Sequence, residues 1–581
     1  MQLEEYWGVG PKTRERLQSA LGTEGAVRAI ESADLRALTE AGLGPGRATA
    51  ILRRAEGGAG MAVLATRDAR SVYKSVLELA ADCAVTRHAA DRVRVLTPLR
   101  ERGAIEDRLD AVSEAIDTWD GLDDDEREAV LAAFEDDGDA GAERASVLTA
   151  IALKDVGVGG GTFARLDELD DADLEAAAEA LAHVRADGTV VEGADAELDR
   201  LRAGLREVEA MEGSAFDVLE TLREEGVRGT EEFREAVIDH VRRETDVPVE
   251  AVREAAPEEA ADAADFVGAT LRDLRVDLRE RVAEREETVA GALRDAVEDA
   301  RAEIDAAVEA VDHAALYLSL ARFAERYDLV RPEIVEGRDV LAVEDARNLE
   351  LAATDGDVQP VTYAVGDHDL AGPPSGDRVT VLTGANSGGK TTLLETLCQV
   401  AVLAQMGLPV PAESAQVSVT DAIVFHRRHA SFNAGVLEST LRTVVPPLAT
   451  GERTLMLVDE FEAITEPGSA ADLLHGLVTL TVDRDALGVF VTHLADDLRP
   501  LPDVARIDGI FAEGLDAELR LEVDYQPRFG TVGRSTPEFI VSRLVADAEA
   551  PAERVAFETL AEAVGQEVVQ RTLADARWGD G

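Results

Sequence analysis

Apolar residues between positions 61 and 345 recur every three or four places among Ala, Glu, Asp, Arg and Leu, the period of helices with one buried face. The clearest stretch, 258–311, contains no proline and as one helix would be about 80 Å long at about 1.5 Å per residue. A second apolar series at 198–222 precedes it, and Pro248 and Pro257 interrupt the path between the two. The pattern predicts a helical core over 61–195, an antiparallel helical hairpin over 196–311 and a return to the helical core over 312–345.

The pattern changes after residue 345. Short runs of β-branched and other large apolar residues occur at 379–382, 455–458 and 489–491, and helical patterns separate them. That alternation is typical of a mostly parallel sheet covered by helices. The sequence therefore predicts an α/β domain over 346–545 and a C-terminal helical segment over 546–581.

Residues 1–57 differ in charge from the rest of the chain. The whole sequence has 59 Lys and Arg against 117 Asp and Glu, a formal net charge of −58, and only four of its residues are lysine. The first 57 residues contain eight charges of each sign, so this segment is the one in which a polyanion is best tolerated. The glycines at 57, 58 and 60 then indicate a linker.

Two Gly-hydrophobic-Gly-Pro motifs lie 34 residues apart in this segment, each before a helical pattern with proline at its first position. Paired glycines let a phosphate approach the backbone, and a helix N-terminus presents N–H groups. The duplication resembles a tandem helix-hairpin-helix domain, which implies binding to the DNA backbone without base readout. A small helical protein-interaction module is the alternative. The residues that the resemblance assigns to DNA are Gly8, Gly10, Lys12, Gly42, Gly44 and Arg47.

The acidic, lysine-poor composition resembles that of halophilic proteins from salt-rich cytoplasm. At about 1 M salt the Debye length is about 3 Å, so the net charge does not exclude nucleic acid as a partner. The chain begins with polar residues, and no run of 18 apolar residues occurs. We therefore expect a soluble, cytoplasmic protein with no membrane partner, in which Cys83 and Cys398 are reduced core thiols.

One segment matches the phosphate-binding pattern G-x-x-x-x-G-K-[ST]. It follows the run at 379–382 and opens a helical pattern at 392–406, the context that this loop requires. Lys390 is expected to contact the β- and γ-phosphates of ATP, and the Thr391 hydroxyl to bind Mg²⁺. The residues expected to hold the nucleotide are Gly384, Ala385, Asn386, Ser387, Gly388, Gly389, Lys390 and Thr391.

Two other strand ends carry polar residues. The apolar run at 454–458 ends in Asp459 and Glu460, and the run at 489–491 leads to Thr492 and His493. Asp459 is expected in the Mg²⁺ shell, and Glu460 is expected to orient or deprotonate the attacking water. His493 is expected to contact the γ-phosphate or that water. Together these residues predict ATP hydrolysis with Mg²⁺.

These motifs resemble the ATPase module of the MutS family over about residues 312–545. Residues 383–392 are similar to that family's T-G-P-N-M-G-G-K-S-T loop, which adds Thr392 to the nucleotide-binding set. Asp459-Glu460 and Thr492-His493 match its Walker B and switch-histidine pairs. By position, the hairpin at 196–311 corresponds to the family's lever and clamp. Tyr363 is the candidate for the aromatic residue that stacks on adenine in that family.

The resemblance also implies a homodimer, in which a segment with a serine and a glutamate completes the partner subunit's nucleotide site. Glu438 aligns with the family's glutamate. Asn433 stands where its serine is expected, unless Ser431 takes that role through a shifted loop.

Mismatch-recognising members of that family begin with a domain that carries a Phe-x-Glu wedge, whereas residues 1–60 contain no Phe. The sequence therefore resembles the archaeal second-type branch and predicts an ATP-dependent, largely sequence-non-specific DNA-binding protein. An SMC- or ABC-type chromosome-maintenance ATPase is an alternative, although only 69 positions separate Lys390 from Asp459 and the predicted hairpin precedes both. A P-loop small-molecule phosphotransferase and a nucleotide-gated scaffold with negligible hydrolysis are further alternatives.

Overall fold

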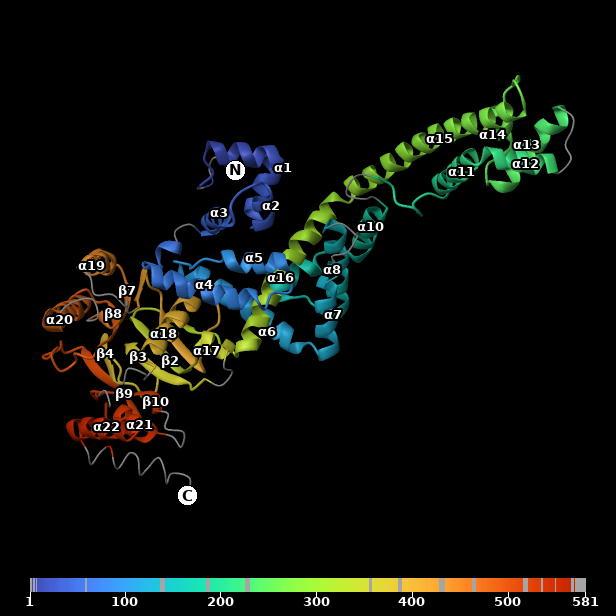
Figure 1. The fold of residues 1–581 in the computed structure, drawn as a ribbon. Coiled ribbons are helices and arrows are strands. Elements are labelled where there is room, and N and C mark those ends of the chain that lie inside the picture. The colour runs from blue at the N-terminus through green and yellow to red at the C-terminus, as the bar shows by residue number, and fades with distance from the viewer. Residues whose placement is uncertain are drawn as a thin grey trace. The chain divides into compact units, whose positions relative to one another are not determined.

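The computed structural model describes most of the chain (Figure 1). The described residues are 3, 6, 8–57, 60–135, 142–183, 189–224, 230–354, 358–384, 389–427, 434–461, 467–515, 521–533, 537–548, 550–565 and 569. Contacts divide the chain into two compact units, residues 1–123 with 312–581 and residues 124–311. In the part of the chain that the structure describes, no helix is long and apolar enough to cross a membrane.

The first unit begins with a small helical module. Its helices are α1 (Pro11–Glu31), which bends at Gly22, α2 (Leu35–Glu40) and α3 (Pro45–Gly57). Leu17, Ile30, Leu38 and Leu52 are buried together in a core that belongs mainly to this module. The two helices expected after the glycine motifs are confirmed, and each begins at its proline.

Helices α4 (Arg67–Ala81), α5 (Arg87–Val95) and α6 (Arg102–Gly121) follow the module. Arg53 of α3 donates two hydrogen bonds to the carbonyl of Arg94, and its guanidinium lies 5.0 Å from the ring centre of Tyr73. Just before α4, Leu64 pairs in parallel with Ile423, so this segment adds to the edge of a sheet in the same unit.

In the described residues of the second unit, 124–135, 142–183, 189–224 and 230–311, the regular elements are helices. They are α7 (Asp124–Glu135), α8 (Ala142–Val156), α9 (Ala164–Asp167), α10 (Asp171–Ala182), α11 (Ala196–Gly213), α12 (Ala215–Glu224), α13 (Thr230–Glu244), α14 (Val249–Ala255) and α15 (Ala263–Asp299), with a short 3₁₀ turn before α9. Ion pairs join Asp195 to Arg285, Glu209 to Arg279 and Glu212 to Arg275, so α11 and α15 run antiparallel.

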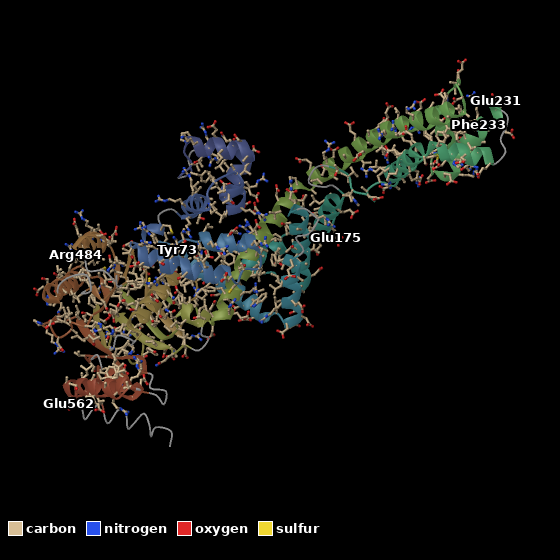
Figure 2. All side chains as sticks on the ribbon, viewed as in Figure 1. Tyr73, Glu175, Glu231, Phe233, Arg484 and Glu562 are labelled. Carbon is tan, nitrogen blue, oxygen red and sulfur yellow. The ribbon has the colours of Figure 1, made fainter. Side chains whose placement is uncertain are left out.

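The far end of this helix pair has its own small core. Phe233 of α13 packs edge to face against Phe266 of α15, with ring centroids 6.3 Å apart (Figure 2). Val208, Leu222 and Val241 are fully buried in the same cluster. The helices between α11 and α15 are thus packed around apolar side chains and do not form a simple turn.

The stretch 258–311 does not form the single helix that its apolar pattern suggested. Helix α15 ends at Asp299, and α16 (Arg301–Tyr327) begins after the single residue Ala300. Leu271, Leu274 and Leu278 are buried, but the apolar positions in the second half of α15 are only half-buried. Little packing therefore holds the helix straight through Ala300. The 37 residues of α15 are about 55 Å long.

Two sheets form the α/β part of the first unit. The six-stranded sheet has the order β10-β9-β4-β8-β7-β6, in which β10 alone is antiparallel to its neighbour. The four-stranded sheet has the order β1-β5-β2-β3. The strands are β1 (Glu333–Val335), β2 (Val340–Ala346), β3 (Val361–Gly366), β4 (Val379–Gly384), β5 (Ser414–Ser418), β6 (Ala422–His426), β7 (Thr454–Asp459), β8 (Leu487–Val491), β9 (Ala505–Leu515) and β10 (Leu521–Arg528).

Helices cover both faces of the six-stranded sheet. Leu455 and Leu457 of β7 point into a core shared with α18 (Lys390–Gln405), whereas Met456 and Val458 point into a core shared with α19 (Ala434–Ala449) and α20 (Pro467–Asp483). Side chains of one strand alternate between two buried faces, as in a doubly covered parallel sheet. The three predicted strands are confirmed as parts of β4, β7 and β8.

Two element assignments need correction. The helical return to the core ends at Tyr327, because β1 and β2 occupy 333–346 and join the smaller sheet, which the sequence pattern did not predict. The C-terminal helices begin before residue 546. They are α21 (Pro537–Asp547) and α22 (Pro551–Val564), with α17 (Leu349–Thr354) a short helix after β2.

The antiparallel helix pair is predicted to lose stability in acid through Asp195. The bidentate contact with Arg285 and the hydrogen bond from the Leu198 amide lower the pKa of Asp195 to about 2. Its stabilising effect is therefore complete above about pH 5 and is lost as the pH falls through 4 toward 2. Asp195→Asn keeps the helix cap but loses the ion pair. Thermal unfolding followed by far-UV circular dichroism gives the melting temperatures of wild type and variant. The difference between them should become smaller from about pH 6 to about pH 3. A difference in melting temperature that does not change with pH would contradict a stabilising role for the Asp195–Arg285 ion pair.

Candidate functional site

The carboxyl ends of three neighbouring strands meet at one edge of the six-stranded sheet. In register, β8 lies between β4 and β7, with Val491 beside both Leu382 and Asp459. The amide of Thr492 donates to the carbonyl of Leu382, which ties the end of β8 to the end of β4. The residues that follow these strands are therefore brought together although they are far apart in the sequence.

The phosphate-loop motif begins at the end of β4 and ends at the first residue of α18. Gly389 caps this helix in the left-handed conformation, with φ +72°. Lys390 is 4% exposed, and its Nζ donates to the carbonyl of Gly384 over 2.9 Å, so its side chain folds back across the loop. A Cβ on Gly384 would lie 2.2 Å from the carbonyl oxygen of Ile510, which requires glycine there. Ala385, Asn386, Ser387 and Gly388 lie outside the described residues.

Thr391 and Asp459 meet at this edge of the sheet. The Thr391 hydroxyl donates to Oδ2 of Asp459 over 2.7 Å, and the Asp459 side chain is almost fully buried. A hydroxyl and a carboxylate are the hard oxygen ligands that Mg²⁺ prefers, and adjacent ligands of an octahedral ion at about 2.1 Å lie about 3 Å apart. The types and spacing of these two side chains therefore fit an Mg²⁺ ion. Thr392 follows on α18 and is half-buried.

Glu460 and His493 form the second polar pair. Nε2 of His493 lies 3.0 Å from Oε1 of Glu460, within hydrogen-bond distance. Glu460 has φ +40°, a conformation that non-glycine residues adopt rarely and mostly at functional sites, and its amide donates to the carbonyl of Val491. The structure thus brings Lys390, Thr391, Asp459, Glu460 and His493 to one edge, as their positions at strand ends predicted.

The expectation that Tyr363 stacks on a base is wrong. Tyr363 is fully buried, and its hydroxyl contacts Thr380 and Asp508. An aromatic residue that the sequence analysis missed lies at the loop instead. A Cβ placed on Gly389 would be 2.7 Å from the ring of Tyr525, a β10 residue that is 39% exposed. No sequence motif marks Tyr525, because it reaches the loop through strand pairing across the sheet.

The residues expected to act on a partner subunit are only partly described. Glu438 lies on the exposed side of α19 and pairs with Arg442 one turn along the same helix. Ser431 and Asn433 lie outside the described residues.

The two glycine motifs of the N-terminal module face each other. Gly8 and Gly42 both have positive φ, +85° and +88°. Arg47 donates from Nη2 to the carbonyl of Gly8 and to the Thr13 hydroxyl, and Arg16 donates to the carbonyl of Gly42. Arg47 thus joins the two motifs to each other, a role that the sequence did not predict. Lys12 is exposed, and a Cβ on Gly10 or Gly44 would meet nothing within 4 Å, so space remains beside both helix starts.

The C-terminal part has the architecture of a P-loop nucleotide-binding domain. Its parallel sheet is covered by helices, and the phosphate-loop motif, the Thr391–Asp459 contact and the Glu460–His493 pair lie at one edge of that sheet. Residues 380–496 match the family model described as MutS domain V, and this range contains the Lys390, Asp459, Glu460 and His493 positions. The predicted resemblance to the MutS family is therefore confirmed for this domain.

Three curated proteins show the range of relatives. The "DNA-binding protein MutS2" of Pyrococcus furiosus is 45% identical over 220 residues, which are 37% of this chain and 38% of that protein. The "DNA mismatch repair protein MutS" of Granulibacter bethesdensis is 30% identical over 350 residues, 56% of this chain and 35% of that protein. The "Endonuclease MutS2" of Thermomicrobium roseum is 30% identical over 217 residues, 36% of this chain and 27% of that protein. The chain thus covers less than two fifths of the length of these relatives, and its similarity to second-type members supports the predicted branch.

Proposed function

We propose that this protein is a DNA-binding ATPase of the second MutS type that hydrolyses ATP with Mg²⁺ and does not recognise mismatches. The observation that carries the proposal is the meeting of Thr391 with Asp459 and of Glu460 with His493 at the end of the loop-bearing strand. Hydrolysis requires a phosphate cradle, a metal shell and a group that handles the attacking water, and these residue types supply all three. The match of residues 380–496 to MutS domain V supports the same activity and disfavours the SMC-type and phosphotransferase alternatives.

We assign the catalytic roles from these contacts. Lys390 exchanges its contact with the Gly384 carbonyl for the β- and γ-phosphates, which compensate its buried charge better than a neutral oxygen. Mg²⁺, when bound, neutralises charge on the phosphate oxygens. The Glu460 carboxylate orients the attacking water and accepts its proton. His493, in contact with Glu460, holds that carboxylate in position and lies at the strand end next to β4 and β7.

The ring of Tyr525 is the surface on which we propose that the adenine base stacks. It is exposed, it lies against Gly389 at the start of α18, and aromatic rings offer a sequence-tolerant stacking platform for a base. The buried Tyr363 cannot offer one.

DNA binding is assigned to the N-terminal module as a tandem helix-hairpin-helix domain. Its two helix starts lie beside glycine turns with positive φ, and the space next to Gly10 and Gly44 admits a phosphate. The first 100 residues contain fifteen Lys and Arg against twelve Asp and Glu, a positive balance in a chain of net charge −58. Residues 196–311 contain sixteen arginines and no lysine against thirty-three acidic residues, so we expect the helical hairpin to bind DNA less strongly than the module.

A homodimer is proposed on two observations. Helices α21 and α22 pack against each other and expose Ile540, Val555 and Leu560 by 54%, 63% and 50%. Large apolar side chains that two neighbouring helices leave exposed favour a protein interface. Glu438 is exposed on α19, as a group that acts on another subunit must be.

Lys390→Ala is predicted to lower the rate of ATP hydrolysis by about a hundredfold or more, because one preorganised charge at the transition state is worth at least that factor. Phosphate release at about 1 M KCl measures it. The variant should still retain duplex DNA in a gel shift. Lys74→Ala, which removes an exposed lysine of α4, is the control and should keep the wild-type rate. Unchanged turnover in Lys390→Ala would refute the site.

Lys12→Glu is predicted to weaken binding to all duplex sequences alike and to reduce the slope of log affinity against log salt by about 1 for each DNA phosphate that the module no longer neutralises. Fluorescence anisotropy over a KCl series measures both quantities. Arg294→Glu, at an exposed position of α15, is the matched control of equal charge change and should bind as the wild type does. A larger loss of DNA affinity in Arg294→Glu than in Lys12→Glu would place the main DNA-binding surface on the helical hairpin.

Light scattering in the presence of ATP is predicted to give twice the chain mass of 62.0 kDa. The double variant Val555→Asp and Leu560→Asp should give a single-chain mass, because it places two charges on the apolar surface of α22. Glu558→Ala, on the same exposed helix, is the control. A single-chain mass for the wild type with and without nucleotide would exclude the homodimer.

A further inference from the structure

The turn at 529–533, directly after β10, contacts the beginning of the phosphate loop. The amide of Gly533 donates to the Thr383 hydroxyl over 2.6 Å. A Cβ on Gly533 would lie 2.9 Å from Cα of Gly384, and a Cβ on Gly509 would lie 2.4 Å from the Gly533 nitrogen. Three backbones therefore meet without side chains between them: the end of β4, strand β9 and this turn.

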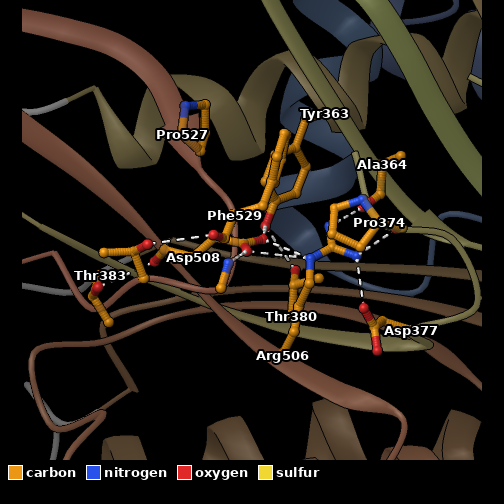
Figure 3. A network of polar contacts seen from close by, with 12 residues as sticks. Tyr363, Ala364, Pro374, Asp377, Thr380, Thr383, Arg506, Asp508, Pro527 and Phe529 are labelled. Carbon is orange, nitrogen blue, oxygen red and sulfur yellow. Dashed lines mark hydrogen bonds and ion pairs between the residues drawn. The ribbon is translucent and has the colours of Figure 1, made fainter. Parts of the chain in front are cut away.

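Asp508 of β9 holds the turn in this place (Figure 3). Its Oδ1 accepts a hydrogen bond from the amide of Gly530 over 3.0 Å, and its backbone carbonyl accepts one from the Thr383 hydroxyl over 3.1 Å. The side chain is fully buried. Burial raises the pKa of the Asp508 carboxyl, and the neighbouring Arg506 opposes that rise. One aspartate thus contacts both the turn and the residue before the loop.

Arg506 fixes the orientation of Asp508. Its Nε lies 3.0 Å from Oδ2 and 3.2 Å from Oδ1 of Asp508, and its Nη1 donates to the carbonyl of Pro374. The rings of Tyr363 and Phe529 pack against each other with centroids 6.1 Å apart, and the guanidinium lies beside both, 5.8 and 5.6 Å from their centres. Burying Arg506 and Asp508 costs desolvation free energy, which their mutual attraction roughly offsets. The ion pair therefore serves mainly to fix one arrangement of the groups around it.

The same hairpin end reaches the other end of the loop. Strand β10, which leads into the turn, carries Tyr525 against Gly389, and the turn itself carries Gly533 against Gly384. The two glycines are the first and the last glycine of the phosphate-loop motif. A displacement of the turn therefore moves contacts at both ends of the loop.

We propose that Thr383 and Asp508 are positioning residues for nucleotide binding, which hold the turn at 529–533 against Gly384 and so set the geometry of the phosphate loop. This inference rests on the proposed function. The Thr383 hydroxyl is the direct link, because it accepts from Gly533 and donates to Asp508. Neither residue carries out chemistry on the nucleotide.

The test compares Thr383→Val with Thr383→Ser. Valine keeps the shape of threonine but leaves the buried Gly533 amide without its acceptor, whereas serine keeps both hydrogen bonds. With a fluorescent ATP analogue and Mg²⁺ at about 1 M KCl, Thr383→Val should bind about tenfold more weakly. Thr383→Ser should bind with nearly wild-type affinity. In turnover, the effect should appear in KM with kcat preserved at saturation, because the support acts equally on the bound substrate and the transition state.

A second pair of variants tests the glycine contact. Gly533→Ala places a methyl group against Gly384 and should weaken nucleotide binding as Thr383→Val does. Gly530→Asn, in the same turn, points into open space, and asparagine tolerates the φ of +69°, so it should bind normally. Melting temperatures of all four variants verify that each is folded.

The outcomes separate the two proposals. A wild-type protein that binds no nucleotide refutes the proposed function, and this inference with it. Wild-type binding that Lys390→Ala abolishes but Thr383→Val leaves unchanged refutes only the positioning role. Equal weakening in Thr383→Val and Thr383→Ser, or an effect confined to kcat, also overturns it.

Discussion

The contact between Thr391 and Asp459 depends on the order of strands in the six-stranded sheet. Thr391 follows β4 and Asp459 ends β7, yet the two side chains lie 2.7 Å apart because β8 alone separates their strands and all three run parallel. Parallel strands collect their carboxyl ends at one edge, where loops of unrelated sequence position form a site. If the order of these strands changed, the loop, the Thr391–Asp459 contact and the Glu460–His493 pair would no longer share an edge.

Much of this site could be predicted from the sequence. The strands that carry it are buried on both faces and appear as continuous apolar runs, and the loop between β4 and α18 needs glycines and one lysine in fixed positions. The helices of the N-terminal module were marked by proline at their first positions.

The remaining features depend on contacts between distant segments. Tyr525 and Asp508 reach the loop because β10 pairs with β9 and β9 with β4, and single-sequence patterns do not report pairing partners. The smaller sheet was missed because β1 has only three residues and β2 contains acidic positions. The break at Ala300 has no helix-breaking residue to mark it in the sequence.

The distribution of charge along the chain favours DNA binding by the N-terminal part. A chain with 117 acidic residues and a net charge of −58 repels a polyanion except where the charge balance is locally restored, and the first 100 residues are such a place. The chain segment that leaves this module pairs with β6 through Leu64, at the edge of the sheet that carries the proposed nucleotide site. We infer that this connection is one route by which nucleotide binding changes the hold of the module on DNA.

We propose that nucleotide binding changes the affinity of this protein for DNA. The most direct test is the DNA dissociation constant of the wild-type protein at about 1 M KCl, measured by fluorescence anisotropy with Mg²⁺ and a non-hydrolysable ATP analogue and again without nucleotide, on duplex and branched DNAs. The dissociation constant should differ between the two states for at least one DNA form. Equal dissociation constants for every DNA, with nucleotide binding verified in the same samples, would contradict this proposal.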